Sequence, residues 1–199
     1  MEIIDAQGID ALSMRSLAQH LDSGTATLYR HFSGRQELIG HVVDRILSEA
    51  SPTLDDDVPR DWQSVVALRA RSMYALLRRY RGIAALLAES IPDGPNAMDI
   101  RERFIGLLLA SGFSAKVASH AYATIARFVL GFAIQFGDQG NFVANPRRSS
   151  SPYRRDVDLQ KYPALNAVSG HLPIGLDDEF EFGLQLLLAG LSLLKEGKA

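Results

Sequence analysis

The sequence predicts an all-α protein, and three observations carry this prediction. Apolar residues recur at three- and four-residue steps along almost the whole chain, as they do in amphipathic helices. No segment combines β-branched residues with the turn residues of a hairpin. The chain has 199 residues, of which 47% are hydrophobic and 22% charged, values typical of a globular protein with a real core. We expect a small N-terminal helical module followed by a larger helical domain.

The first fifty residues are predicted to form four short helices. The first three are expected at residues 1–7, 14–21 and 25–32, and the fourth opens near residue 33. Ser13 is placed to cap the free N–H groups of the second helix. Ser33 and Gln36 have the spacing of a capping box, which predicts the start of the fourth helix.

Ser51-Pro52 and the acidic residues 55–57 mark a boundary, so we divide the chain into residues 1–50 and 51–199. Helices of the second part are expected at residues 62–80, 83–90, 97–111, 114–136 and 177–195. Between the last two, prolines and a basic run at residues 147–155 indicate a long connection with one short helix near residues 159–168.

Several classes of function are disfavoured by what the sequence lacks. There are no cysteines, which excludes disulfides and thiolate metal sites. The five histidines form no HxxxH or HExxH pair, and there is neither a glycine-rich phosphate loop nor a GxSxG motif. We therefore expect no enzyme, no metal site and no cofactor.

The compartment and the charge balance also follow from the sequence. The first residues do not resemble a secretory signal, and apolar runs such as 184–194 fall short of the roughly 20 residues that span a bilayer. We expect a cytoplasmic protein without a membrane partner. The net charge of −2 means that any binding to nucleic acid must come from local charge placement.

Residues 14–32 have the proportions of a helix-turn-helix, with Ala18 small where the two helices must cross closely. The outward residues 25–31 include Arg30, which can donate two hydrogen bonds to a guanine edge, and threonines whose methyl groups can contact thymine. The alternative is that these residues form the solvated face of a small bundle.

The amino-acid sequence of this segment favours DNA binding. Leu28-Tyr-Arg-His-Phe32, followed by Ser-Gly-Arg and Glu-Leu, resembles the end of the DNA-reading module of tetracycline-repressor-like (TetR family) regulators, and residues 8–18 are similar to its first turn and second helix. The resemblance implies contacts to operator DNA by a defined set of residues: Met14, Arg15, Thr25, Ala26, Thr27, Tyr29, Arg30, His31 and Arg35. Thr27 and Arg30 would read bases, and Tyr29, His31 and Arg35 would hold phosphates.

Residues 62–199 resemble the ligand-binding and dimerising domain of the same family, in the branch of the tetracycline repressor itself. Candidate lining of an effector pocket is Trp62, Arg69, Met73, Leu87, Arg103, Phe104, Leu107 and Tyr122. Plain core packing is the alternative for each of them. Where the tetracycline repressor has polar and metal-linked drug contacts, this chain has Arg69 and Leu87, so we expect an apolar or anionic effector rather than magnesium–tetracycline.

The last helix is expected to form a homodimer together with the helix at 114–136, because Gly183 and Gly190 share one face of it and many apolar residues surround that face. The alternative is a seam inside the core of one protomer. The candidate interface is Phe128, Gly131, Phe132, Gln135, Gly183, Leu184, Leu187, Gly190, Leu191 and Leu194. The prediction is a dimeric repressor that binds a pseudo-palindromic operator and is released by a small molecule. A rival interpretation, a small-molecule-binding dimer that has lost DNA binding, is motivated by the acidic first module and a first helix shorter than in the family.

Overall fold

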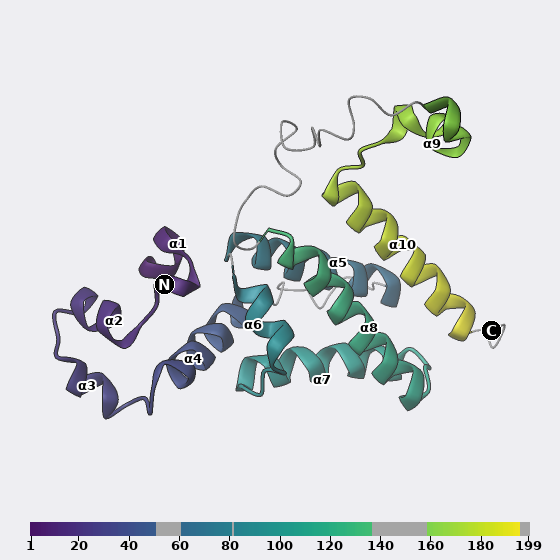
Figure 1. The fold of residues 1–199 in the computed structure, drawn as a ribbon. Coiled ribbons are helices and arrows are strands. Elements are labelled where there is room, and N and C mark those ends of the chain that lie inside the picture. The colour runs from purple at the N-terminus through teal and green to yellow at the C-terminus, as the bar shows by residue number, and fades with distance from the viewer. Residues whose placement is uncertain (51–60, 81, 137–158, 196–199) are drawn as a thin grey trace.

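The structure is a computed structural model that describes residues 1–50, 61–80, 82–136 and 159–195. These residues form helices and turns without a strand, which confirms the predicted all-α fold (Figure 1). The predicted boundary near residues 51–60 and the basic run at 147–155 lie outside the described residues. In Figure 1, α1 to α3 lie on one side of the molecule, and α4 runs from them towards the remaining helices.

The N-terminal module contains α1 (Glu2–Gln7), a 3-10 turn η1 (Ile9–Ala11), α2 (Met14–His20), α3 (Thr25–Tyr29) and α4 (Arg35–Leu47), which a second 3-10 turn, η2 (Ser48–Ala50), follows. The predicted Ser13 cap is confirmed. The Ser13 hydroxyl accepts a hydrogen bond from the Ser16 N–H at 3.0 Å, and the Ser16 hydroxyl accepts one from the Ser13 N–H at 2.9 Å. Such reciprocal bonds satisfy two backbone donors that the helix leaves free.

The predicted capping box at Ser33 and Gln36 is wrong. The helix α4 begins one residue later than the box requires, with Gly34 as its N-cap. The third helical residue is therefore Glu37, whose carboxylate accepts a hydrogen bond from the Ser33 N–H at 2.6 Å. The helix α3 is also shorter than expected and ends at Tyr29, before a turn that closes on Leu28.

The larger module is built around α8 (Ala115–Ile134), which packs against α5 (Trp62–Arg79), α6 (Ile83–Glu89), α7 (Pro95–Ala110) and α10 (Leu176–Lys195). A stripe of small and branched residues faces this core from α8: Ala118, Ala121, Ile125, Val129 and Ala133 are all buried. By length and composition alone α8 is also long and apolar enough to cross a membrane, which corrects the expectation that every apolar run is too short. Here it is the central helix of the larger module.

A cluster of aromatic rings joins α5, α8 and α10. The ring of Tyr74 stacks on that of Phe180 with centroids 4.0 Å apart, and Phe128 lies 5.2 Å from Phe180. The Tyr74 hydroxyl donates to an Asp177 carboxylate oxygen at 3.0 Å, and burial raises the pKa of Tyr74 well above its ordinary value. Gly183 lies against this cluster, where an added Cβ would be 2.7 Å from the Phe128 ring. The lack of a side chain at residue 183 lets the Phe128 ring lie this close.

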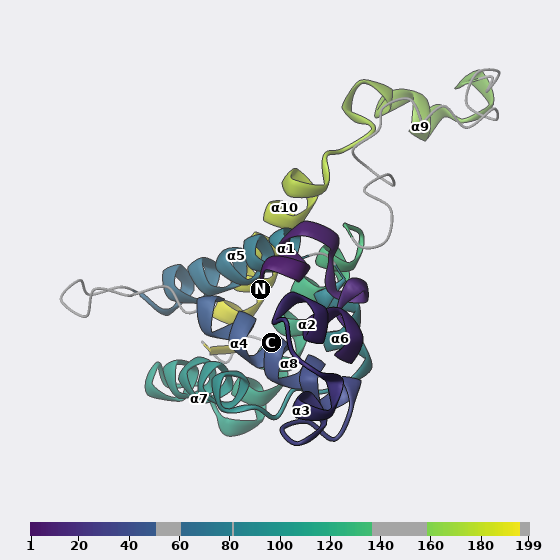
Figure 2. The ribbon, with the colours of Figure 1, turned by 90° about the vertical axis from the view of Figure 1, so that its left-hand side faces the viewer.

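The connection before α10 forms an arm that extends away from the other helices (Figures 1 and 2). It contains α9 (Pro163–Ala167) between two 3-10 turns, η4 (Leu159–Lys161) and η5 (Ser169–His171), so the helix predicted near 159–168 is shorter than expected. Residues 160–175 are all exposed, including the apolar side chains of Tyr162, Leu165 and Ile174. The arm therefore buries little of its own apolar surface.

The packing at Gly183 gives a first prediction. We expect Gly183→Ala to lower the free energy of unfolding by about 1–3 kcal/mol, because the new methyl group overlaps Phe128. The control is Gly40→Ala in α4, where an added Cβ meets nothing within 4 Å and the higher helix propensity of alanine should stabilise the protein by at most about 1 kcal/mol. Urea unfolding at one protomer concentration measures both. Equal effects of the two changes would show that Phe128 adjusts without cost.

Candidate DNA-reading face and effector module

The reading face is formed by α3 and the turn that follows it. Leu28 is only 6% exposed and anchors α3 in the N-terminal core, against α2. The remaining side chains of this segment point away from that core: Thr25, Ala26, Thr27, Tyr29, Arg30 and His31 are all exposed. Tyr29 is 57% exposed, an unusual state for so large a ring. The structure thus places four predicted DNA contacts on α3 and two, Arg30 and His31, in the turn that follows it.

Two predicted contacts lie at the start of α2 and have different environments. Arg15 is exposed and remains a candidate for a phosphate contact. Met14 is 6% exposed and belongs to the core between the first helices. Its side chain is therefore not available to DNA, and its assignment as a DNA contact is corrected. An apolar residue in the first turn of a helix in so small a module serves the core first.

Arg35 has a structural role that the sequence did not reveal. Its Nε donates a hydrogen bond to the Leu12 carbonyl oxygen at 2.9 Å, which fastens the start of α4 to the segment before α2. A guanidinium has five N–H donors, so this bond leaves others for a phosphate.

Close by, hydrogen bonds from Ser33 hold the pKa of Glu37 below its ordinary value. The carboxylate of Glu37 is therefore charged at neutral pH.

The candidate effector residues belong to the contact region of α5, α6, α7 and α8. Trp62 packs edge-on against Phe113 with ring centroids 4.9 Å apart, and Phe104 packs against Tyr122 at 5.7 Å. Trp62 and Phe104 are buried, whereas the other apolar candidates are partly buried against the same core: Met73, Leu87, Leu107 and Tyr122. These six side chains are thus parts of, or packed against, the hydrophobic core.

Two arginines give this region a positive charge. Arg103 on α7 forms an ion pair with Asp99, with its Nε 2.9 Å from the carboxylate oxygen. Arg69 on α5 is half-buried, and its pKa is lowered first by burial and then by the charge of Arg103. Arginine remains protonated in proteins despite such shifts. The single carboxylate of Asp99 thus faces two guanidinium groups.

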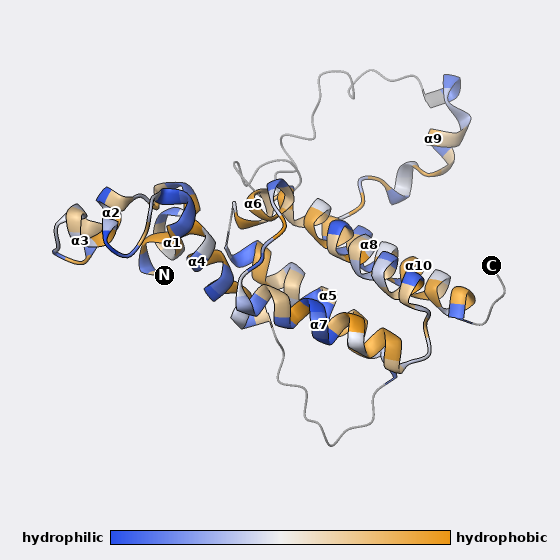
Figure 3. Cartoon of the chain, turned by 90° about the horizontal axis from the view of Figure 1, so that it is seen from below, coloured by the Kyte–Doolittle hydropathy of each residue, from blue (hydrophilic) through white to orange (hydrophobic). Residues whose placement is uncertain are grey.

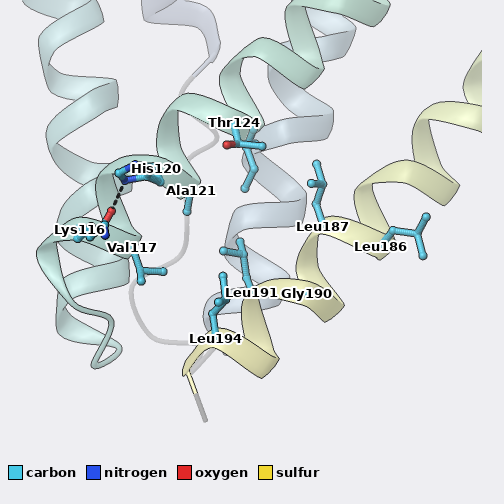
Figure 4. Close-up of a pocket in the computed structure, with 11 residues that line it drawn as sticks. Lys116, Val117, His120, Ala121, Thr124, Leu186, Leu187, Gly190, Leu191 and Leu194 are labelled. Atoms are coloured by element: carbon cyan, nitrogen blue, oxygen red, sulfur yellow. Dashed lines mark hydrogen bonds between the residues drawn. The ribbon is translucent and has the colours of Figure 1, made fainter. Parts of the chain in front are cut away.

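A second feature is a groove between α8 and α10 with a volume of about 570 Å³ (Figure 4). It is lined by Lys116, Val117, His120, Ala121, Thr124, Ile125, Leu186, Leu187, Gly190, Leu191 and Leu194. None of the predicted effector residues lines it, but four predicted interface residues do, all on α10. The α8 side was missed, although Val117, Ala121 and Ile125 have the four-residue spacing of one helix face.

The predicted dimer face is only partly exposed. Leu184 is fully buried within its own protomer, so its assignment to a subunit interface is wrong. Phe128, Phe132 and Gly183 also take part in the aromatic packing of the chain itself, and Leu191 is 8% exposed. The exposed apolar side chains of α10 include three that were not predicted: Phe182 at 65%, Leu186 at 58% and Leu193 at 51%. Gly131, Gln135, Gly190 and Leu194 are exposed.

Apolar residues cover more than one side of α8 and α10 (Figure 3). On such a helix the sequence does not show which stripe faces inward, because both stripes have helical spacing. Among the residues that the structure describes, no group of three or more histidine, aspartate or glutamate side chains could hold a metal ion.

An exposed reading helix in a helix-turn-helix, joined through α4 to a helical domain with apolar surfaces, defines a DNA-binding transcriptional regulator. The chain belongs to the tetracycline repressor (TetR) family. Residues 1–42 match the family described as "Bacterial regulatory proteins, tetR family". Residues 55–194 match the one described as "Tetracyclin repressor-like, C-terminal domain". The family predicted from the sequence is thus confirmed.

Individual relatives agree. The chain is 32% identical to the HTH-type transcriptional repressor DrrR1 of Streptomyces coeruleorubidus, over 98% of this chain and 74% of that protein. It is 28% identical to the tetracycline repressor protein class G of Vibrio anguillarum, over 98% and 90%. Apo ActR from Streptomyces coelicolor has a TM-score of 0.85 and 31% identity, covering 100% of this chain and 93% of that one. ActR in complex with actinorhodin gives 0.83 and 30%, with the same coverage.

These relatives are transcriptional regulators, and they support the predicted function of a ligand-responsive DNA-binding repressor.

Proposed function

We propose that the chain is a repressor that binds a pseudo-palindromic operator as a homodimer and leaves it when a small molecule binds the larger domain. The observation that carries the DNA part is the exposed α3, which Leu28 holds so that Thr27, Tyr29 and Arg30 face outward. Arg30 reads a guanine and Thr27 a thymine methyl group, while Arg15, His31 and Arg35 hold phosphates. Such a protein acts in the cytoplasm, where the DNA is.

The homodimer is supported by apolar surface that the protomer leaves uncovered. On α10, Phe182, Leu186 and Leu193 are more than half exposed, and Ile134 on α8 is 40% exposed. The groove between these helices offers a seat for a second copy of α10. A two-fold contact of this kind would place two reading helices in successive major grooves, roughly 34 Å apart.

The effector is proposed to be an apolar molecule with an acidic group. Aromatic and aliphatic side chains between α5, α7 and α8 would cover its apolar part. Arg69 and Arg103, which share the single carboxylate of Asp99, would bind its negative charge. The relative ActR is known in complex with actinorhodin, which makes that compound a suitable first probe.

The DNA-reading role is tested by selecting operator DNA from random duplexes. We expect a pseudo-palindromic site whose affinity falls by about 1–3 kcal/mol in Arg30→Ala, with relaxed specificity at one base pair of each half-site. Arg45→Ala removes the same charge from the exposed surface of α4 and is the control. If selection returns no preferred sequence, the chain is the small-molecule-binding dimer of the rival interpretation.

The dimer is tested by Leu186→Lys on the exposed face of α10. We expect a monomer in analytical ultracentrifugation, because the change buries a charge in the interface, and loss of operator binding under conditions where the unchanged protein is saturated. Met98→Lys, at a similarly exposed apolar residue of α7, should leave both properties unchanged. A Leu186→Lys protein that remains dimeric would move the interface to another surface.

The effector class is tested with actinorhodin as the probe. We expect it to release the operator complex, and we expect Arg69→Gln to weaken its binding about 10- to 100-fold, as loss of a charged hydrogen bond does. Arg45→Gln, which lies outside the effector domain, is the control. Magnesium–tetracycline should not release DNA at the same concentration. Equal binding by the Arg69→Gln and unchanged proteins would exclude Arg69 as the anion contact.

A further inference from the structure

We propose that Asp44 on α4, by capping the N-terminus of α7, is the positioning residue that transmits movement of α7 to the DNA-reading helix. The inference deepens the proposed function, on which its operator measurements rest. Asp44 is neither one of the proposed DNA contacts nor one of the proposed effector contacts. The evidence for this role is the set of hydrogen bonds that the first N–H groups of α7 donate to Asp44.

The start of α7 has no cap from its own segment. Its N-cap residue is Gly94, which has no side chain, and its first helical residue is Pro95, which has no N–H. The next two N–H groups, those of Asn96 and Ala97, donate to the two oxygens of the Asp44 carboxylate at 3.3 and 3.0 Å. The side-chain amide of Asn96 donates to the same carboxylate at 2.8 Å.

This arrangement differs from the caps of α2, α5 and α8. Ser13, Asp61 and Ser114 each cap the helix that follows them directly. Such a local cap stabilises a helix without tying it to another element. The cap of α7 comes from α4, 52 residues earlier in the chain for Asn96. The negative charge also lies at the positive end of the α7 dipole, where a carboxylate is favoured.

Gly94 is what leaves room for the carboxylate. A Cβ at this position would overlap the side chain of Asp44. The backbone of Gly94 has φ −64° and ψ 161°, a conformation that any residue adopts, so the glycine is not required by the backbone. We therefore attribute the glycine at residue 94 to the space that the Asp44 side chain needs.

The hydrogen bonds from Asn96 and Ala97 to Asp44, which we call the Asp44 clamp, connect the two functional regions through α4. At its start, α4 is fastened to the reading module by the bond from Arg35 to the Leu12 carbonyl oxygen. Asp44 lies nine residues later, about 13 Å along the helix axis. On α7, the candidate effector residues Arg103 and Phe104 follow Ala97 by about 10 Å. A displacement of α7 by a bound molecule therefore reaches α4 through direct hydrogen bonds.

The test separates a coupling role from a merely stabilising one. Asp44→Ala removes the clamp and leaves space at residue 94, and Asp44→Ala with Gly94→Asp then returns a cap to α7 from its own segment. We expect Asp44→Ala to lower both the free energy of unfolding and the affinity for the operator. The double variant should regain the lost free energy of unfolding. It should nevertheless keep the weakened operator affinity, by at least about fivefold, the low end of typical allosteric coupling. Glu102→Ala, which removes an exposed carboxylate of α7, should change neither property.

A second measurement needs no DNA and uses the absence of native cysteines. Spin labels at Gln19→Cys on α2 and Ser119→Cys on α8 report the distance between the modules, in protein diluted with an excess of unlabelled chain. We expect this distance distribution to broaden in Asp44→Ala and to stay broad in the double variant. Asp44→Asn keeps one acceptor oxygen, so the distribution should broaden less. It is also the milder change should Asp44→Ala not fold.

Recovery of the narrow distribution or of operator affinity in the double variant would overturn the proposal and leave Asp44 a structural cap. If the unchanged protein selects no operator while the distances behave as expected, the clamp stands and the proposed DNA function fails. If the distribution stays narrow in Asp44→Ala, the clamp itself is refuted.

Discussion

The packing of α8 at the centre of the larger domain determines where the other helices lie. Its buried stripe combines three alanines with Ile125 and Val129, and the small side chains let α5, α6 and α7 approach closely. Because packed interiors are dense and shift little, the positions of these helices are not independent. The start of α7 is therefore fixed by the core, and with it the place where Asp44 anchors α4. The reading helix is the last link in this series of contacts.

The same packing explains which surfaces are left for partners. The aromatic cluster around Phe180 uses one side of α10 against α5 and α8, so the other side keeps Phe182 and Leu186 exposed. At the opposite end of the molecule, Leu28 holds α3 against α2 and leaves its polar side chains outward. Burial thus sorts the chain into an inner scaffold, an uncovered apolar face on α10 and an exposed polar face on α3.

Local chemistry was predictable from the sequence, but the choice of helix face was not. The Ser13 cap could be predicted because a serine directly before the first residue of a helix is a common N-cap. The capping box predicted at Ser33 and Gln36 was wrong by one residue, because Glu37 rather than Gln36 accepts the hydrogen bond from the Ser33 N–H. Leu184 and Leu186 are chemically identical, and only the packing of α10 shows that one is buried and the other exposed. The Asp44 clamp joins residues too far apart for any local pattern.

The charge of the reading module makes this geometry decisive. With a net charge of −2 and with Glu37 kept ionised beside the reading helix, the chain attracts DNA phosphates only weakly. In the proposed homodimer, most of the affinity must then come from two helices that fit successive major grooves together. Binding of that kind is sensitive to the distance between the helices, because one misplaced helix loses its base contacts. In the proposed mechanism, a small movement of α4, transmitted by the Asp44 carboxylate, is what releases the operator.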